Sequence, residues 1–322
     1  MNLLSKLPTA KLLSLAKKIV PIVFYAALVV FLYFYLKSID FEKLKDVKVD
    51  WLFVTISTVF GLAFRYWGAY IWLVLLKGLG AKNLTNRTQL LYVYAKSWLG
   101  RYIPGTAPWI LGKIYFASKQ GISKNKLAVS SLLEGGLQVN VVLILSLLIL
   151  SFDSRLNIID IRFKFLMIAI AIVGIISLTP RVFNKIVSIT YKLLKKKTLD
   201  EEHLADGKTI LTGAGLYTIG AVISGISFFY MAKAVFPDLF YSDALFVIGT
   251  ASLAGAVSML AIFSPSGLGV REGIQLALLS LIMPTELALV VTVFTRLWSI
   301  VTDLLFFGLA TLTRGRSQIK DN

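Results

Sequence analysis

The chain contains no cysteine and only one histidine among its 322 residues. The absence of cysteine excludes disulfides, thiol nucleophiles and thiolate metal sites. The one histidine, His203, lies in a charged segment, no Asp-x-Asp pair is present, and Ser266-Gly267 is not followed by histidine. The side chains that common lipid phosphatases and metal-dependent transferases use are therefore missing. We expect no metal site and no cofactor.

Acidic residues are also scarce, with 17 against 34 lysines and arginines, which leaves a formal net charge of +17. Apolar residues make up 57% of the chain, and the mean hydropathy is +0.77. The apolar residues are gathered in long blocks, which is typical of membrane spans. We expect residues 1–322 to form a single all-α, polytopic membrane domain without a soluble domain.

Six apolar runs are long enough to cross a bilayer. They are residues 19–36, 51–76, 128–150, 158–178, 210–235 and 287–311. Two further blocks contain helix-breaking residues. The first, about 88–120, holds Pro104-Gly105, and the second, about 243–283, holds Pro265-Ser266-Gly267.

Each breaker-containing block is followed by an apolar run that carries a charge, Glu134 in the first case and Arg296 in the second. This duplication is typical of transporters built from two repeats. We predict two repeats, residues 51–150 and 210–311, inverted relative to each other, with each block forming a re-entrant hairpin beside six spanning helices. Eight spanning helices, with both blocks crossing the membrane, are the alternative.

The basic residues lie in alternate loops, which predicts a cytoplasmic (inner) membrane protein with both termini in the cytoplasm. The segment 181–208 is then a cytoplasmic basic linker. Its apolar residues recur at helical spacing, so it forms either an amphipathic helix on the membrane surface or a solvated loop. Because the charge is spread in this way, we expect anionic lipid head groups as partners and no nucleic acid.

Several charged residues and helix breakers lie within the apolar blocks. We take the following as substrate-binding candidates: Arg65, Arg101, Pro104, Gly105, Lys113, Glu134, Gly267, Gly269, Arg271, Glu272, Arg296 and Asp303. A central arginine costs roughly 2.5 to 3.5 kcal/mol to insert, so these charges need partners. Arg296 and Asp303 lie on one helical face and could bridge between turns. Helix starts at the breakers expose N–H groups suited to an anion. Ion pairs that only fix helix packing are the competing interpretation.

Four short motifs follow one another along the chain. They are Arg65-Tyr66-Trp67, then Gly100-Arg101-Tyr102-Ile103-Pro104-Gly105 with Lys113 and Gly121-Ile122, then Pro265-Ser266-Gly267-Leu268-Gly269-Val270-Arg271-Glu272, and finally Arg296. Together they resemble a flippase-like membrane family that includes the transmembrane region of bacterial lysylphosphatidylglycerol synthases. The resemblance covers nearly the whole chain. The chain departs from the family pattern at Ser266, where a glycine is usual, and at Gly135, where an arginine is usual.

The resemblance implies movement of a lipid or lipid-linked anion between leaflets. Some relatives carry a soluble aminoacyl-transfer domain, which the printed sequence lacks, so we expect no enzyme here. The leading hypothesis is a flippase for an anionic phospholipid or a polyprenyl-phosphate-linked lipid, with Arg65, Arg271 and Arg296 holding the phosphate. Glu134, Glu272 and Asp303 would neutralise the empty site or couple transport to protons.

Two other hypotheses remain open. One is an integral-membrane enzyme acting on a polyprenyl-phosphate substrate, and the other is a non-transporting assembly subunit. Partners could include a second copy of the chain or a separate lipid-modifying enzyme.

Overall fold

A computed structural model describes residues 48–102, 107–158, 160–195, 199, 204–261, 267 and 269–320. All regular secondary structure in these ranges is helical. The expected span at residues 19–36 lies outside them, as do Pro104, Gly105 and Pro265.

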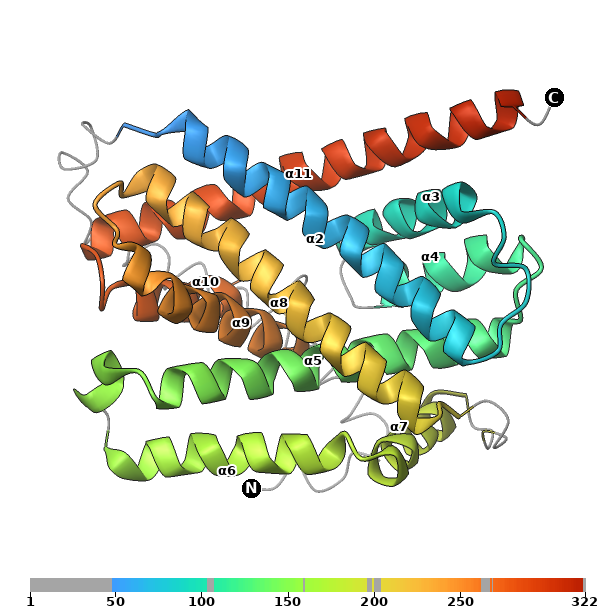
Figure 1. Ribbon diagram of the computed structural model, residues 1–322, viewed down its shortest axis with the longest axis horizontal. Helices are drawn as coiled ribbons and strands as arrows, with labels where there is room; N and C mark the ends of the chain where they lie inside the picture. Colours follow the sequence, from blue (N-terminus) through green and yellow to red (C-terminus); the bar gives the residue numbers. More distant parts are fainter. Residues whose placement is uncertain are drawn as a thin grey trace, which may run out of the picture.

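Long helices form the frame of the structure (Figure 1). They are α2 (Trp51–Gly78), α5 (Lys124–Ser151), α8 (Gly207–Val235) and α11 (Thr285–Lys320). Shorter helices lie between them: α3 (Arg87–Trp98), η3 (Leu99–Tyr102), α4 (Ala107–Ser118), η4 (Ser154–Ile158), α6 (Ile161–Ser177), α7 (Pro180–Lys195), η6 (Tyr241–Asp243), α9 (Ala244–Leu260) and α10 (Val270–Leu279).

The helix starts are set by short polar side chains that cap free N–H groups. Asp50 accepts a hydrogen bond from the Leu52 N–H, Asn86 from that of Gln89 and Asp206 from that of Thr209, at 2.8–3.0 Å. Hydrogen bonds from Thr209 hold the pKa of Asp206 below its usual value. These caps place the ends of the apolar runs close to the boundaries expected from the sequence.

Five helical segments of the described chain are long and apolar enough to cross a membrane. Four of them are α2, α5, α8 and α11, as expected. The fifth, Tyr241–Leu260, contains α9, which we had expected to be one arm of a hairpin. The expected span at 158–178 differs, because α6 meets the criteria only together with α7, and the two are bent by 85°.

Helices of the first half of the chain pack against helices of the second half. Helix α2 packs along α8 (Figure 1), α3 of the first half packs on α11, and α9 of the second half packs on α5. Figure 1 shows α3 and α4 at the end where α2 stops and α5 starts, and α9 and α10 at the opposite end. The two-repeat organisation and its inversion across a bilayer remain predictions.

Helix α7 covers the first part of the basic linker, up to Lys195, and its place on the membrane surface remains a prediction. Phe183, Val187 and Tyr191 are buried and pack in a cluster with residues of α2, α5 and α8. On a different face, Ile186 and Leu193 are exposed. A helix with one apolar face on the protein and another facing outward suits the membrane surface.

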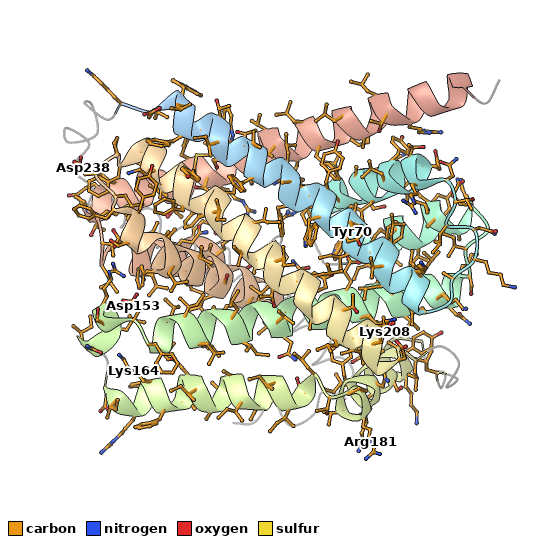
Figure 2. All side chains as sticks on the ribbon, viewed as in Figure 1. Tyr70, Asp153, Lys164, Arg181, Lys208 and Asp238 are labelled. Atoms are coloured by element: carbon orange, nitrogen blue, oxygen red, sulfur yellow. The ribbon has the colours of Figure 1, made fainter. Side chains whose placement is uncertain are left out.

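Charge is distributed unequally between the two ends of the molecule. Figure 2 shows Arg181 and Lys208 at one end, and Asp153, Lys164 and Asp238 at the other. The basic end is the one predicted to face the cytoplasm, and this orientation remains a prediction.

Candidate functional site

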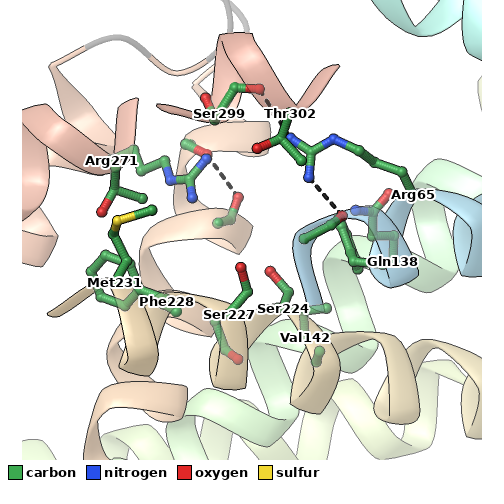
Figure 3. Close-up of a pocket in the computed structure, with 18 of the residues that line it drawn as sticks. Arg65, Gln138, Val142, Ser224, Ser227, Phe228, Met231, Arg271, Ser299 and Thr302 are labelled. Atoms are coloured by element: carbon green, nitrogen blue, oxygen red, sulfur yellow. Dashed lines mark hydrogen bonds between the residues drawn. The ribbon is translucent and has the colours of Figure 1, made fainter. Parts of the chain in front are cut away.

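A cavity of about 180 Å³ lies between the two halves of the protein (Figure 3). Its walls come from α2, α5, α8, α9, α10 and α11, with Trp98 and Arg101 added by α3 and η3. Arg65, Arg101 and Arg271 line it, and none of the described lining residues is an aspartate or glutamate. The wall therefore presents positive charge without acidic groups of its own.

Arg65 is held in place by three groups of the protein. Its Nε donates to the Asp303 carboxylate, one terminal nitrogen donates to the Gly61 carbonyl at 2.8 Å, and the other to the Ser299 carbonyl at 3.1 Å. The cost of placing this guanidinium in apolar surroundings is offset by these contacts. Since all three nitrogens are engaged, Arg65 shapes the wall more than it offers free donors.

Asp303 is the acceptor on which the surrounding donors converge, and its side chain is fully buried. Besides Arg65, it accepts from the Tyr102 hydroxyl and from Trp98 Nε1, the latter at 3.0 Å. Arg101 lies 3.8 Å from its second oxygen and stacks over the Trp98 ring. Asp303 thereby ties α11 to α2, α3 and η3 through one carboxylate.

Arg296 and Asp303 do not bridge, contrary to the expectation from their spacing. Seven residues bring them to one face of α11 but separate them by about 10 Å along the axis. Asp303 pairs with Arg65 instead, and Arg296 lies 3.5 Å from Glu272 on α10.

Arg271 lines the cavity from the start of α10, and Figure 3 labels it with Met231 among the lining residues. It makes no ion pair and no hydrogen bond within the described part of the chain. Its neighbour Glu272 is engaged, because it accepts a hydrogen bond from the Gly269 N–H at 2.7 Å and faces Arg296. A guanidinium without an ion pair among the described residues has donors available for an anionic group.

The turn before α10 requires glycine. Gly267 and Gly269 have φ of +69° and +87°, a region that other residues rarely adopt. A Cβ added to Gly267 would lie 2.3 Å from the Cβ of Ser258. The two glycines therefore let the chain turn tightly beside α9 and direct α10, with Arg271, toward the cavity.

Lys113 and Glu134 form a separate, sealed ion pair between α4 and α5, with side chains only 1% and 2% exposed. Tyr94 donates to the carboxylate at 3.4 Å, and the ammonium lies 4.1 Å from the ring centre of Trp109. Neither charge lines the cavity. This pair joins α4 to α5 much as Glu272 and Arg296 join α10 to α11.

Of the substrate-binding candidates, the structure thus brings Arg65, Arg101 and Arg271 to the cavity, with Asp303 directly behind the first two. It also reveals a set of hydroxyl and amide side chains in the wall that sequence reasoning missed, including Gln138, Ser224 and Ser252. The three-residue spacing of Ser224 and Ser227 was a weak signal for one polar helix face.

Several apolar helices of membrane-spanning length around a charged interior define a multi-pass α-helical membrane protein. Residues 18–306 match the family described as the lysylphosphatidylglycerol synthase TM region. The chain therefore belongs to this family of lipid-modifying membrane proteins. Neither the curated proteins nor the solved structures contain a match.

Proposed function

We propose that the protein is a flippase, which moves an anionic phospholipid or a polyprenyl-phosphate-linked lipid between membrane leaflets without changing it chemically. The phosphate would enter the central cavity while the lipid tails stay in the bilayer. The observation that carries this proposal is Arg271, a guanidinium that lines the cavity and has no partner among the described residues.

The charge of the cavity supports an anionic ligand. Arg65 is paired with Asp303, and Arg271 adds a positive charge that has no ion pair among the described residues. Intramembrane charges of this kind are expensive and usually mark a substrate path. A phosphate group of the substrate would compensate this positive charge. A purely structural role would not need positive charge without an acidic partner.

The placement of the shorter helices is consistent with movement between two sides. Helices α3 and α4 lie at one end of the molecule and α9 and α10 at the other, and both halves contribute to the cavity wall. In transporters with two related halves, rocking of one half against the other exposes a central site alternately to each side. We propose the same motion here. We also propose that the protein lies in the cell membrane and that the basic end, which bears Lys208, faces the cytoplasm.

The test uses purified protein in liposomes that contain a fluorescent phosphatidylglycerol in both leaflets. Dithionite, which reduces only the outer leaflet, should bleach about half of the signal without protein and more of it with active protein. Arg271→Ala should abolish the extra bleaching, and Arg271→Lys should restore part of it. Arg162→Ala, at an exposed position at the start of α6, is the matched control.

An unchanged rate in Arg271→Ala would refute the assignment of the phosphate site. Conversion of the lipid to a new product would favour the enzymatic alternative, and bleaching at the protein-free level with every anionic lipid would favour an assembly subunit.

A further inference from the structure

A cluster of basic and aromatic side chains lies outside the cavity, where α3 packs on α4 and α11. The Arg314 guanidinium of α11 lies 4.5 Å from the ring centre of Tyr92 on α3. The Lys96 ammonium, about one turn further along α3, lies 5.9 Å from the same ring centre and 4.4 Å from that of Phe116 on α4. Two cations from different helices therefore share one tyrosine ring. None of these four residues lines the cavity.

Neither cation has an acidic partner among the described residues. Within that part of the chain, Lys96 and Arg314 make no ion pair and no hydrogen bond, and Arg314 Nε is buried without an acceptor. The face of an aromatic ring attracts a cation but does not neutralise its charge, so the two cations still repel each other. Because buried donors normally have an acceptor, these two side chains call for an anionic ligand.

The opposite end of the molecule contains a neutralised counterpart. Arg155 of η4, just after α5, lies 5.1 Å from the ring centre of Phe246 on α9. It also pairs with Asp153 at 2.9 Å and with Asp243. Each arginine thus joins a long helix to the shorter helix that packs on it, and both use an aromatic ring. The protein itself supplies carboxylates to Arg155, whereas it supplies none from the described residues to Arg314.

The cluster lies at the level expected for phospholipid head groups. Arg314 is the last residue of the apolar segment Thr285–Arg314, which is long enough to cross a membrane. Apolar surface adjoins the cations, because Leu312 on α11 and Tyr115 beside Phe116 are 66% and 56% exposed. A soluble anion would leave this surface uncovered. A phospholipid offers a phosphate to the cations and acyl chains to the apolar surface.

We infer that Lys96 and Arg314 bind the phosphate of an acidic phospholipid that lies against α3 and α11, in the leaflet at the end that bears Lys208 (Figure 2). This lipid is a resident ligand and not the transported one, because Lys96 is exposed and the site lies outside the cavity. Its phosphate joins α11 to α3, the helix that precedes the Pro104-Gly105 break. The inference does not depend on the proposed function.

The experiment uses the full chain in detergent with one fluorophore on an introduced cysteine, since the chain has none of its own. Thr311→Cys places the fluorophore at an exposed position one turn before Arg314, and Thr212→Cys, exposed near the start of α8, is the matched control position. Lipids that carry a nitroxide close to the head group quench the fluorophore when they bind beside it. We expect phosphatidic acid to quench Thr311→Cys at about thirtyfold lower concentration than phosphatidylcholine, the size expected for two basic side chains at a membrane surface. The difference at Thr212→Cys should be much smaller.

Variants assign the preference to the two cations. Lys96→Gln with Arg314→Gln should remove most of the preference at Thr311→Cys, and Arg314→Lys, which keeps the charge, should retain part of it. Arg181→Gln with Lys208→Gln removes one arginine and one lysine from exposed positions at the same end, and should leave the preference largely in place. Unchanged melting without added lipid shows that each variant is folded.

Two further measurements separate this site from other sources of binding. Inorganic phosphate should not displace the labelled phosphatidic acid, and displacement would identify a site for a soluble anion. Arg271→Ala should leave quenching at Thr311→Cys unchanged, and loss of quenching would assign the lipid to the cavity. Either of these contrary results would overturn the inference.

Equal quenching of Thr311→Cys by phosphatidic acid and phosphatidylcholine, or a preference that survives in the Lys96→Gln, Arg314→Gln variant, would also overturn it. These outcomes are distinct from failure of the proposed function. A protein that binds phosphatidic acid at this cluster but leaves the leaflets unmixed in liposomes would retain the lipid site and lose the flippase role.

Discussion

Ser57 of α2 and Ser227 of α8 exchange hydrogen bonds, each hydroxyl donating to the other's backbone carbonyl at 2.7 and 2.8 Å. The two residues are 170 positions apart and lie where α2 packs on α8 beside the cavity. Close approach of two helices through small polar residues is a common way of joining spans in a membrane. We therefore regard the α2–α8 contact as the fixed axis of the proposed motion.

A cross-link at this axis should be tolerated. The chain has no cysteine, so Ser57→Cys with Ser227→Cys introduces the only thiols, and their side-chain oxygens now lie 3.3 Å apart. We expect the disulfide to form on mild oxidation and lipid movement to continue at a rate within about twofold of the reduced form. Full loss of movement on oxidation, recovered by reduction, would show that α2 and α8 must separate.

Neutralising Asp303 should be costly. Asp303→Asn leaves the buried Arg65 without its carboxylate, and breaking such a pair typically costs about 3 to 5 kcal/mol. We expect a markedly lower melting temperature in detergent, measured by tryptophan fluorescence. The double variant Arg65→Met, Asp303→Leu should melt closer to the parent protein than Asp303→Asn does, and a double variant less stable than Asp303→Asn would contradict this account.

The sealed pair should behave as a structural element. Lys113→Met leaves the Glu134 carboxylate buried without its partner, and Glu134→Gln leaves the Lys113 ammonium in the same position. Each variant should therefore lower the free energy of unfolding by about 3 to 5 kcal/mol. Lys113→Met with Glu134→Leu removes both charges and should recover most of the loss, as shown by a double-mutant cycle of melting free energies. Additive losses in the double variant would mean that the two charges act independently.

Glu272 should position Arg271. Glu272→Gln keeps an oxygen for the Gly269 N–H but loses the charge facing Arg296, whereas Glu272→Ala loses both contacts. Because a helix cap contributes about 1 kcal/mol, we expect Glu272→Ala to weaken phosphatidylglycerol binding about fivefold and Glu272→Gln less. Asp238→Asn, an exposed loop change, is the control, and equal effects of the two Glu272 variants would remove the capping role.

The orientation of the protein can be tested with single thiols. Lys208→Cys and Asp238→Cys place one cysteine at each end of an otherwise cysteine-free chain, both at exposed positions. A membrane-impermeant maleimide should label Asp238→Cys in intact cells and Lys208→Cys only after lysis. Labelling of both, or of Lys208→Cys alone, in intact cells would reverse or exclude the predicted topology.

Much of the architecture was accessible from the order of residues. The helices α2, α5, α8 and α11 follow apolar runs, and capping residues start α2 and α8, because these signals are local. The glycines before Arg271 also predicted a turn, and Gly269 has a positive φ that few other residues adopt. The ion-pair partner of each charged residue could not be predicted from such local signals, and the spacing of Arg296 and Asp303 suggested a wrong pair.

Composition and spacing alone establish an all-helical membrane protein with excess positive charge and two interrupted segments, because hydropathy and helix breaking act over neighbouring residues. Packing in three dimensions assigns Arg65 to Asp303 across 238 positions, seals Lys113 with Glu134 and leaves Arg271 facing the cavity. These pairings depend on which helices pack together. A buried charge without a partner costs much free energy, so each charge pairs with a group on the helix that packs beside it.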